Sequence, residues 1–140
     1  MSKIPITAEV GQHLPDVVFG PITRTTLALY AGASGDHNPA HIDIDFAREA
    51  GLDDVFAHGM LSYGVLSRVV TSWAGPERLR EFSARFVSIT QIQDEITCKA
   101  EVLECFQAEG ESRARLSVVA MAQDGRVTLS GEAVVALQEP

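Results

Sequence analysis

Residues 59–74 read GMLSYGVLSRVVTSWA, the longest apolar-rich stretch of the chain, and Arg68 is its one charged residue. Apolar side chains fall on nearly every side of the helix that this stretch would form, and a helix of that kind is buried. Gly75 and Pro76 follow directly, and proline cannot continue a helix because it lacks a backbone N–H. The sequence therefore predicts a long central helix that ends at about residue 74.

After Pro76 the hydrophobic pattern changes from helical to alternating. Apolar and polar residues alternate over about 96–102, 113–120 and 127–137, and a further strand is expected near 81–87. Glu109-Gly110 and Asp124-Gly125 are typical of hairpin turns between such strands. The alternation predicts antiparallel strands with one buried and one solvated face. We expect an α+β fold in which the central helix lies against the apolar face of a curved sheet.

The first half of the chain predicts an arm and two shorter helices. Residues 4–20 contain scattered proline and glycine, which is typical of a weak edge strand or an extended arm. Thr23 is a good N-cap for a helix over about 24–33, and Asp43 for one over 44–50. Glycines mark where these helices should end: Gly32 and Gly35 for the first, Gly51 for the second.

Composition limits the class of protein and its partners. The chain has 140 residues, of which 46% are hydrophobic and 21% charged, so we expect a single globular domain over 1–140. No apolar run approaches the roughly 18 residues that span a bilayer. The net charge of −8 disfavours binding to nucleic acid or to an anionic membrane. The N-terminus lacks the apolar segment of a secretory signal, so we expect a cytoplasmic location.

Three further expectations concern the surface. A sheet of this kind leaves an edge strand open, and pairing two edges across a two-fold axis covers it, so a dimer is expected. Cys98 and Cys105 lie seven apart, on opposite faces of one strand, and should not form a disulfide. Four arginines form a candidate group for an anionic ligand, or else a solvated face paired with nearby glutamates: Arg68, Arg78, Arg80 and Arg85.

The residues with most chemistry lie in the segment 34–43, SGDHNPAHID. Asn38-Pro39 rules out a helix here, so Asp36 and His41 share a loop on which both side chains can converge. A carboxylate beside an imidazole can transfer protons and hold a water molecule between them. The first amides of the helix after His58 form a candidate oxyanion site if they face this loop. The alternative is structural: Asp36 caps a turn and His41 is a satisfied loop histidine.

Other kinds of site find less support. His37 and His41 are four apart, but Pro39 removes the helix that this metal-ligand spacing needs, and no calcium loop follows Asp43, so no metal is expected. The segment 59–64 has one residue too many for the nucleophile elbow of a serine hydrolase. The chain has no glycine-rich phosphate loop, so no nucleotide cofactor is expected.

The segment 34–43, with Tyr30 before it and Ala57-His58-Gly59-Met60-Leu61 after it, closely resembles the hydratase 2 signature. That signature belongs to the MaoC-like (R)-specific enoyl-CoA hydratases and the related mycolic-acid and fatty-acid dehydratase subunits. The likeness extends from near Val10 to the last strand at 130–135. It implies a hot-dog fold, in which an antiparallel sheet wraps around a long central helix, two protomers join their sheets, and an acyl tunnel lies near the dimer interface.

The resemblance also implies roles for single residues. Asp36 and His41 would be the catalytic dyad, and the Gly59 amide would bind the thioester oxygen as the oxyanion hole. Asn38 would brace the loop and Ser67 would support the site from the helix. The reaction implied is the cofactor-free, reversible hydration of trans-2-enoyl thioesters of CoA or acyl-carrier protein to (R)-3-hydroxyacyl thioesters, the work of a hydro-lyase in fatty acid metabolism.

Three alternatives stay open at this point. In the first, the chain is the catalytic subunit of a heterodimeric 3-hydroxyacyl-ACP dehydratase. In the second, it is a non-catalytic subunit that binds acyl thioesters, and in the third it is a thioesterase on the same fold. The chain also departs from the family pattern at 89–95, ITQIQDE, where a proline and a glycine are common. Because glutamine takes a positive φ less readily than glycine does, we expect a reshaped turn and infer no preference for acyl-chain length.

Overall fold

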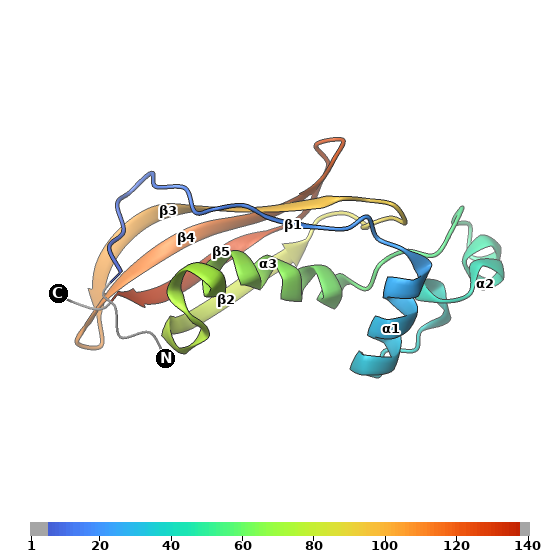
Figure 1. The fold of residues 1–140 in the computed structure, drawn as a ribbon, viewed down its shortest axis with the longest axis horizontal. Coiled ribbons are helices and arrows are strands. Elements are labelled where there is room, and N and C mark those ends of the chain that lie inside the picture. Colours follow the sequence, from blue (N-terminus) through green and yellow to red (C-terminus); the bar gives the residue numbers. More distant parts are fainter. Residues whose placement is uncertain (1–5, 138–140) are drawn as a thin grey trace.

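The computed structural model describes residues 6–137, so the first two residues of the expected arm, Ile4 and Pro5, lie outside it. One long helix, α3, lies against a five-stranded sheet, and two shorter helices extend beyond the end of that sheet (Figure 1). The elements in chain order are β1 (Val17–Phe19), α1 (Arg24–Ser34), η1 (Pro39–His41), α2 (Ile44–Glu49), α3 (Gly59–Ala74), η2 (Pro76–Arg78), β2 (Leu79–Phe86), β3 (Ile96–Ala108), β4 (Glu111–Ala122) and β5 (Val127–Leu137).

The sheet has the strand order β1-β3-β4-β5-β2, and all its pairs are antiparallel. The two expected hairpin turns are present, and Glu109 and Gly110 take the positive φ angles of 49° and 76° that tight hairpin turns require. The expected arm contributes the short edge strand β1, whose Val17 pairs with Cys98. β2 forms the opposite edge and pairs within the chain only with β5 over the described residues.

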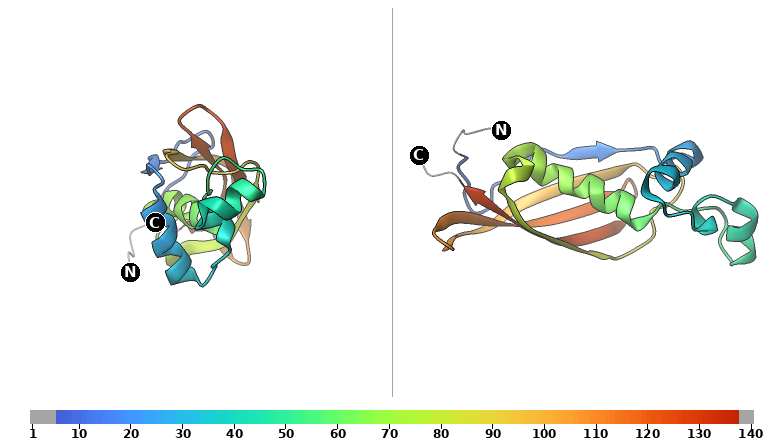
Figure 2. Two further views of the ribbon diagram at one scale, coloured as in Figure 1. Left: turned by 90° about the vertical axis from the view of Figure 1, so that its right-hand side faces the viewer. Right: turned by 90° about the horizontal axis from the view of Figure 1, so that it is seen from below.

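The main core lies between α3 and the sheet, and the right-hand view of Figure 2 shows α3 lying along the sheet. Leu66, Val69 and Val70 of α3 are buried against inward side chains of the long strands, such as Val102 and Leu116. The helix is not buried all round, because its opposite side, which includes Met60, Gly64 and Arg68, is exposed. The expected α+β arrangement is confirmed, and it is the hot-dog fold: a curved antiparallel sheet around a long helix.

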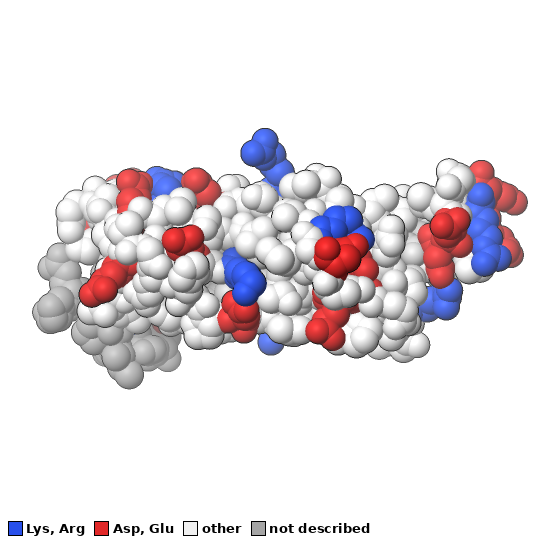
Figure 3. Space-filling view, turned by 90° about the horizontal axis from the view of Figure 1, so that it is seen from above, with Lys and Arg blue, Asp and Glu red and all other residues white. Residues whose placement is uncertain are grey.

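The outer face of the sheet is solvated and charged. The alternation is clear in β3, where Cys98 and Ala100 are buried and Lys99 is exposed. Lysines and arginines on this face lie beside acidic residues (Figure 3), as in the ion pairs of Lys99 with Asp16 and of Arg115 with Glu104. Cys98 is buried and Cys105 is exposed, both as free thiols. The bulge between Val102 and Glu104 places them opposite Ala120 and Ala114, on the same face of β3, so the expectation of opposite faces is wrong.

A second, smaller core lies in the part of the chain that extends beyond the sheet, where Figure 1 shows α1 and α2. Ile22, Leu27, Ala47, Val55 and Ala57 form it. This core joins α1 and α2 to the segment that leads into α3. It therefore fixes both ends of the polar loop between α1 and α2.

The caps of these helices confirm most of the expected boundaries. The Thr23 side chain accepts from the Thr26 N–H at 3.1 Å, and the Asp43 side chain accepts from the Asp45 N–H at 3.0 Å. The first helix ends at Gly35, whose φ is +77°, whereas Gly32 lies inside the helix and does not end it. Within residues 6–137 the structure contains no helix with both the length and the apolar character needed to cross a bilayer.

Candidate active site

The loop after α1 is shaped by short hydrogen bonds between side chains and backbone. The Asp36 N–H donates to Ser34 Oγ at 3.2 Å, and Asp36 Oδ1 accepts from the Asn38 N–H at 3.2 Å. Asn38 Oδ1 accepts in turn from the Ala40 N–H at 3.0 Å and caps the short turn η1. The loop turns back on itself, so that Asp36 and His41 come together.

His41 is fixed by the segment that precedes α3. The side chain is 8% exposed, its Nδ1 lies 2.7 Å from the carbonyl oxygen of Phe56, and its ring contacts the Phe56 ring edge-on at 4.7 Å. A carbonyl oxygen only accepts, so Nδ1 carries the proton in this bond. In the neutral ring Nε2 is therefore left as the basic nitrogen.

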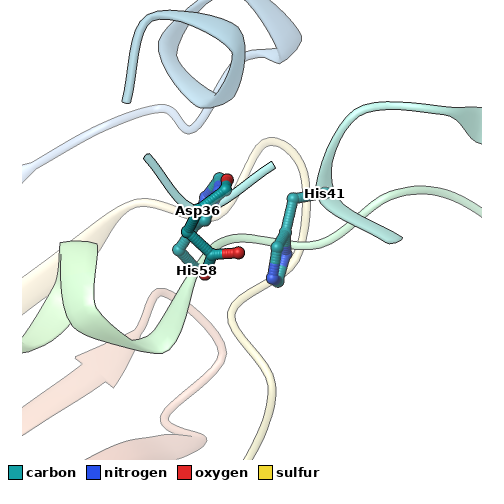
Figure 4. A group of neighbouring side chains, drawn as sticks. All are labelled: Asp36, His41 and His58. Carbon is teal, nitrogen blue, oxygen red and sulfur yellow. The ribbon is translucent and has the colours of Figure 1, made fainter. Parts of the chain in front are cut away.

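Asp36, His41 and His58 form one cluster. A carboxylate oxygen of Asp36 and one ring nitrogen from each histidine lie within 4.8 Å of one another, with Asp36 exposed and both histidines buried. In Figure 4 the Asp36 carboxylate points toward the His41 ring. Two hydrogen bonds of about 2.8 Å span such a gap, so one water molecule can bridge the carboxylate and the imidazole.

His58 is the member of the cluster to which the sequence assigned no role. Its Nε2 lies 3.1 Å from the backbone oxygen of Asp36, and its ring stacks on that of His41 at 4.0 Å with an interplanar angle of 27°. The Tyr30 ring contacts it edge-on at 4.8 Å. Burial lowers the pKa of His58 and outweighs the hydrogen bond to the Asp36 carbonyl, which raises it; the neighbouring His41 lowers it further, against the charge of Asp36. One signal was available: histidine stands at the N-cap of α3, where serine, threonine, aspartate or asparagine is preferred.

The geometry of the cluster does not suit a metal ion. Ligand atoms of a tetrahedral zinc lie about 2 Å from the metal and so about 3.5 Å from one another. The lone pairs of an imidazole lie in its ring plane, and the planes of His41 and His58 are stacked at 27°. A metal bound in the plane of one ring would lie well outside the plane of the other.

The start of α3 adjoins this cluster, because His58 is the N-cap of the helix. Gly59 is the first helical residue, and His58 at the N-cap makes no side-chain hydrogen bond to the amides of the first turn. These amides carry the positive end of the helix dipole. The helix start is fixed by the Ala57 N–H, which donates to the Thr90 carbonyl at 2.9 Å, and by the contact of Ser62 Oγ with Thr90 Oγ1 at 3.3 Å.

A cavity of about 290 Å³ adjoins Gly59. Its walls are mainly apolar and include Phe56, Phe86, Ile89 and Leu129. The absence of a side chain at residue 59 allows the ring of Phe86 to approach closely, because a Cβ at that position would lie 2.8 Å from it. An apolar chain lying in this cavity would have its polar end near the amides of α3.

The turn at 89–95 keeps a left-handed residue although it has no glycine. Gln93 takes a φ of +68°, and the Gln93 N–H donates to the Ile22 carbonyl at 2.7 Å. Asp94, which is buried, accepts from the Gln91 N–H at 2.8 Å and forms an ion pair with Arg126. These bonds hold the turn in a conformation that glutamine disfavours, next to the wall of the cavity.

Two other expected features lie apart from the cluster. Ser67 is eight residues into α3 from Gly59, about 12 Å along the axis, and its hydroxyl donates to the Gly64 carbonyl at 2.6 Å. The arginine group is not a common surface, because Arg78 is buried and Arg80 is paired with Glu111. Arg68 and Arg85 are exposed on α3 and β2. Of the two interpretations that the sequence left open, the structure therefore contradicts a single anion site formed by all four arginines.

Comparisons with known proteins match the chain to one family over most of its length. The model of the MaoC like domain matches residues 6–123. An (R)-specific enoyl-CoA hydratase of Rhodospirillum rubrum is 32% identical over 116 residues, which cover 81% of this chain and 78% of that protein. The fatty acid synthase subunit beta of Aspergillus oryzae is 39% identical over 114 residues, which cover 77% of this chain but only 5% of that subunit.

A solved structure of a hydratase also matches the chain over most of its length. The unliganded R-hydratase PhaJ1 from Pseudomonas aeruginosa superposes with a TM-score of 0.81 at 30% sequence identity, over 94% of this chain and 83% of that one. This chain belongs to the MaoC-like domain family.

Proposed function

We propose that this protein is a hydro-lyase that adds water reversibly to trans-2-enoyl thioesters and forms (R)-3-hydroxyacyl thioesters without a cofactor. The observation that carries the proposal is the meeting of Asp36 and His41 beside the open N-terminus of α3 at Gly59. These three features correspond to the three needs of the reaction: a held water molecule, a base and a stabilised oxyanion. The names of the related hydratases support the reaction type.

The dyad would activate the water molecule. Because Nδ1 of His41 donates to the Phe56 carbonyl, Nε2 is free to take a proton from water held between His41 and Asp36. The water oxygen bonds to C3 of the substrate, and the electrons of the C2–C3 double bond move toward the thioester carbonyl. The dyad then returns a proton to C2 on the same face, so the sum is one molecule of water added. Dehydration is the same path in reverse.

The amide of Gly59 would act on the charge that forms during this step. Negative charge develops on the thioester oxygen only as water attacks, so a donor at this oxygen stabilises the transition state more than the substrate. Gly59 is the first residue of α3 and its amide has no partner within the helix. The apolar cavity beside it would hold the acyl chain.

We propose further that the 140-residue chain acts as one domain and assembles as a dimer through the open edge of β2. The exposed Phe86 and Val87 lie at the end of this edge, and a paired edge would cover them. A homodimer would have twice the 15.1 kDa mass of the chain. We place the reaction in the cytoplasm, since the free thiols of Cys98 and Cys105 suit a reducing compartment.

The proposal is tested by incubating the purified protein with crotonyl-CoA, with longer enoyl-CoA thioesters and with the matching acyl-carrier-protein thioesters. We expect loss of the enoyl absorbance, formation of the (3R) product and a dimer by light scattering. Release of free thiol without hydration would indicate a thioesterase. Tight binding without turnover would indicate a binding subunit, and activity only with a co-purified second chain would indicate a heterodimeric dehydratase.

A further inference from the structure

His58 lies between the two halves of the site. It follows Ala57, whose N–H is bound to the Thr90 carbonyl, and precedes Gly59, the first residue of α3. The side chain is 1% exposed, although its ring contacts both members of the proposed dyad. A histidine this deeply buried beside two catalytic candidates requires an explanation beyond filling space.

The hydrogen bond of His58 shows which ring nitrogen carries a proton. Its Nε2 lies 3.1 Å from the Asp36 carbonyl oxygen, which only accepts, so Nε2 carries a proton. Nδ1 is buried and has no hydrogen-bond partner among residues 6–137. A second proton on Nδ1 would be a buried donor without an acceptor, which is unfavourable. The ring is therefore a neutral donor, and burial, which lowers its pKa, favours the same state.

Stacking gives His58 a second contact with the dyad. The ring of His41 is held by two contacts. Its Nδ1 donates to the Phe56 carbonyl, and its face stacks on the ring of His58 with 4.0 Å between the ring centroids. The titratable groups that contact His58 are Tyr30 from α1, Asp36 from the loop and His41 from η1. A charge on His58 would oppose a charge on His41, so a neutral His58 leaves His41 free to take a proton.

We propose that His58 is a positioning residue, which holds the backbone of Asp36 with one nitrogen and the ring of His41 with its face while remaining uncharged. In the proposed hydration reaction, His58 contacts neither the substrate nor the water molecule. The inference rests on the proposed function, since it concerns the geometry of the same dyad. Loss of the hydrogen bond to Asp36 and loss of the stacking on His41 should each lower kcat on its own. A positioning residue should therefore show both partial losses, whereas a catalytic base should show one full loss.

The test uses two His58 variants of the full chain that each keep one contact. His58→Phe keeps a flat ring for stacking and loses the donor to Asp36, whereas His58→Gln keeps an N–H donor and loses the ring. His37→Phe and His37→Gln are matched controls at an exposed histidine of the same loop. His41→Gln is the reference for loss of a catalytic group. Each protein is assayed with crotonyl-CoA for kcat, KM and the pH profile, and its unfolding is measured.

We expect each His58 variant to lower kcat about 10- to 100-fold, since a misplaced catalytic group has losses of this order. KM should change by less than about three-fold, and the acid limb of the pH profile should stay at the wild-type pH, because that limb belongs to the dyad. The two His37 controls should match the wild type. ¹⁵N NMR of the imidazoles should show His58 as the neutral Nε2–H form and should show a change at His41 in His58→Phe.

Three results would overturn the inference. Full kcat in both His58 variants would show that neither contact matters. A loss equal to that of His41→Gln together with loss of the acid limb would make His58 a catalytic base. A doubly protonated His58 by NMR at neutral pH would contradict its neutral state, even if every variant failed to fold. If His41→Gln were itself fully active, the proposed function would fail while the NMR result for His58 would still stand.

Discussion

The side chains of the sheet with α3 and those of the segment from Gly35 to His58 are held in place by different interactions. In the first region, side chains such as Leu66 and Leu116 are held by burial among many neighbours on a regular backbone. In the second, each functional group depends on one or two named bonds, as when His41 donates to the Phe56 carbonyl and His58 to the Asp36 carbonyl. Changes in the first region should therefore lower stability, and changes in the second should lower the rate.

Outside the dyad itself, the largest effect is expected at Gly59, where the two regions meet. Gly59→Pro removes the amide donor, yet proline suits the first position of a helix and His58 already has the extended ψ of 131° that a following proline favours. Gly59→Ala is the matched control, because it adds a similar contact with Phe86 but keeps the N–H. We expect kcat of the proline variant to fall about 100- to 1000-fold below that of the alanine variant. Equal rates would show that the amide has no catalytic role.

In the core, Leu66→Ala should have the opposite profile. Leu66 is 0% exposed between α3 and the sheet, and such truncations lower the free energy of unfolding by about 3 kcal/mol. The activity per folded molecule should stay within a few-fold of the wild type. Leu103→Ala, at a side chain that is 42% exposed, should change the unfolding free energy by less than about 0.5 kcal/mol. Urea titration measures both, and equal losses would argue against the packing of α3 described above.

A smaller effect concerns pH. Burial lowers the pKa of His58 below its ordinary value of 6.5, so in the range just below 6.5 the unfolded chain binds more protons than the folded one. The contribution of neutral His58 to stability is thus complete above pH 6.5 and is lost as the pH falls toward the pKa of the folded state.

This pH effect is measured by urea unfolding at several pH values between 5 and 7.5. The decline of the unfolding free energy on acidification should be shallower in His58→Phe than in the wild type and unchanged in His37→Phe. An equal decline in all three proteins would contradict a neutral, buried His58.

The smallest effect is expected in the turn beside the cavity. Gln93 takes a φ of +68°, which disfavours a residue with a Cβ by about 1–2 kcal/mol, while glycine loses about 0.5–1 kcal/mol of backbone entropy. Gln93→Gly should therefore raise the free energy of unfolding by about 0.5 kcal/mol. Gln91→Gly, which relieves no such strain, should lower it by a similar amount. Changes of the same sign in both variants would refute this explanation.

The same contrast explains what the sequence predicted. Helix α3 begins and ends where the sequence indicated, because its apolar run and Gly75-Pro76 are local signals. The caps at Thr23 and Asp43 and the hairpin at Glu109-Gly110 are local too. The spacing of apolar residues along the sequence does not predict features that depend on distant partners. These are the strand order, the bulge between Val102 and Glu104, and the three-residue length of β1.

For the candidate site, the loop motif indicated Asp36, Asn38 and His41, but not what holds them. His58 bonds to a backbone carbonyl 22 residues away, and no side-chain pattern records such a bond. The arginine group failed for a related reason, since nearness in sequence does not reveal that Arg78 is buried while Arg80 is paired with Glu111.

We infer that Asp36 and His41 perform the chemistry while the rest of the fold holds them in place. The most direct measurement compares crotonyl-CoA hydration by the wild type, Asp36→Asn and His41→Gln, with His37→Gln as the control and thermal unfolding recorded for each. We expect a loss of about 100- to 10,000-fold in each dyad variant, with unchanged unfolding midpoints and full activity in the control. Equal rates in the wild type and both dyad variants would contradict it.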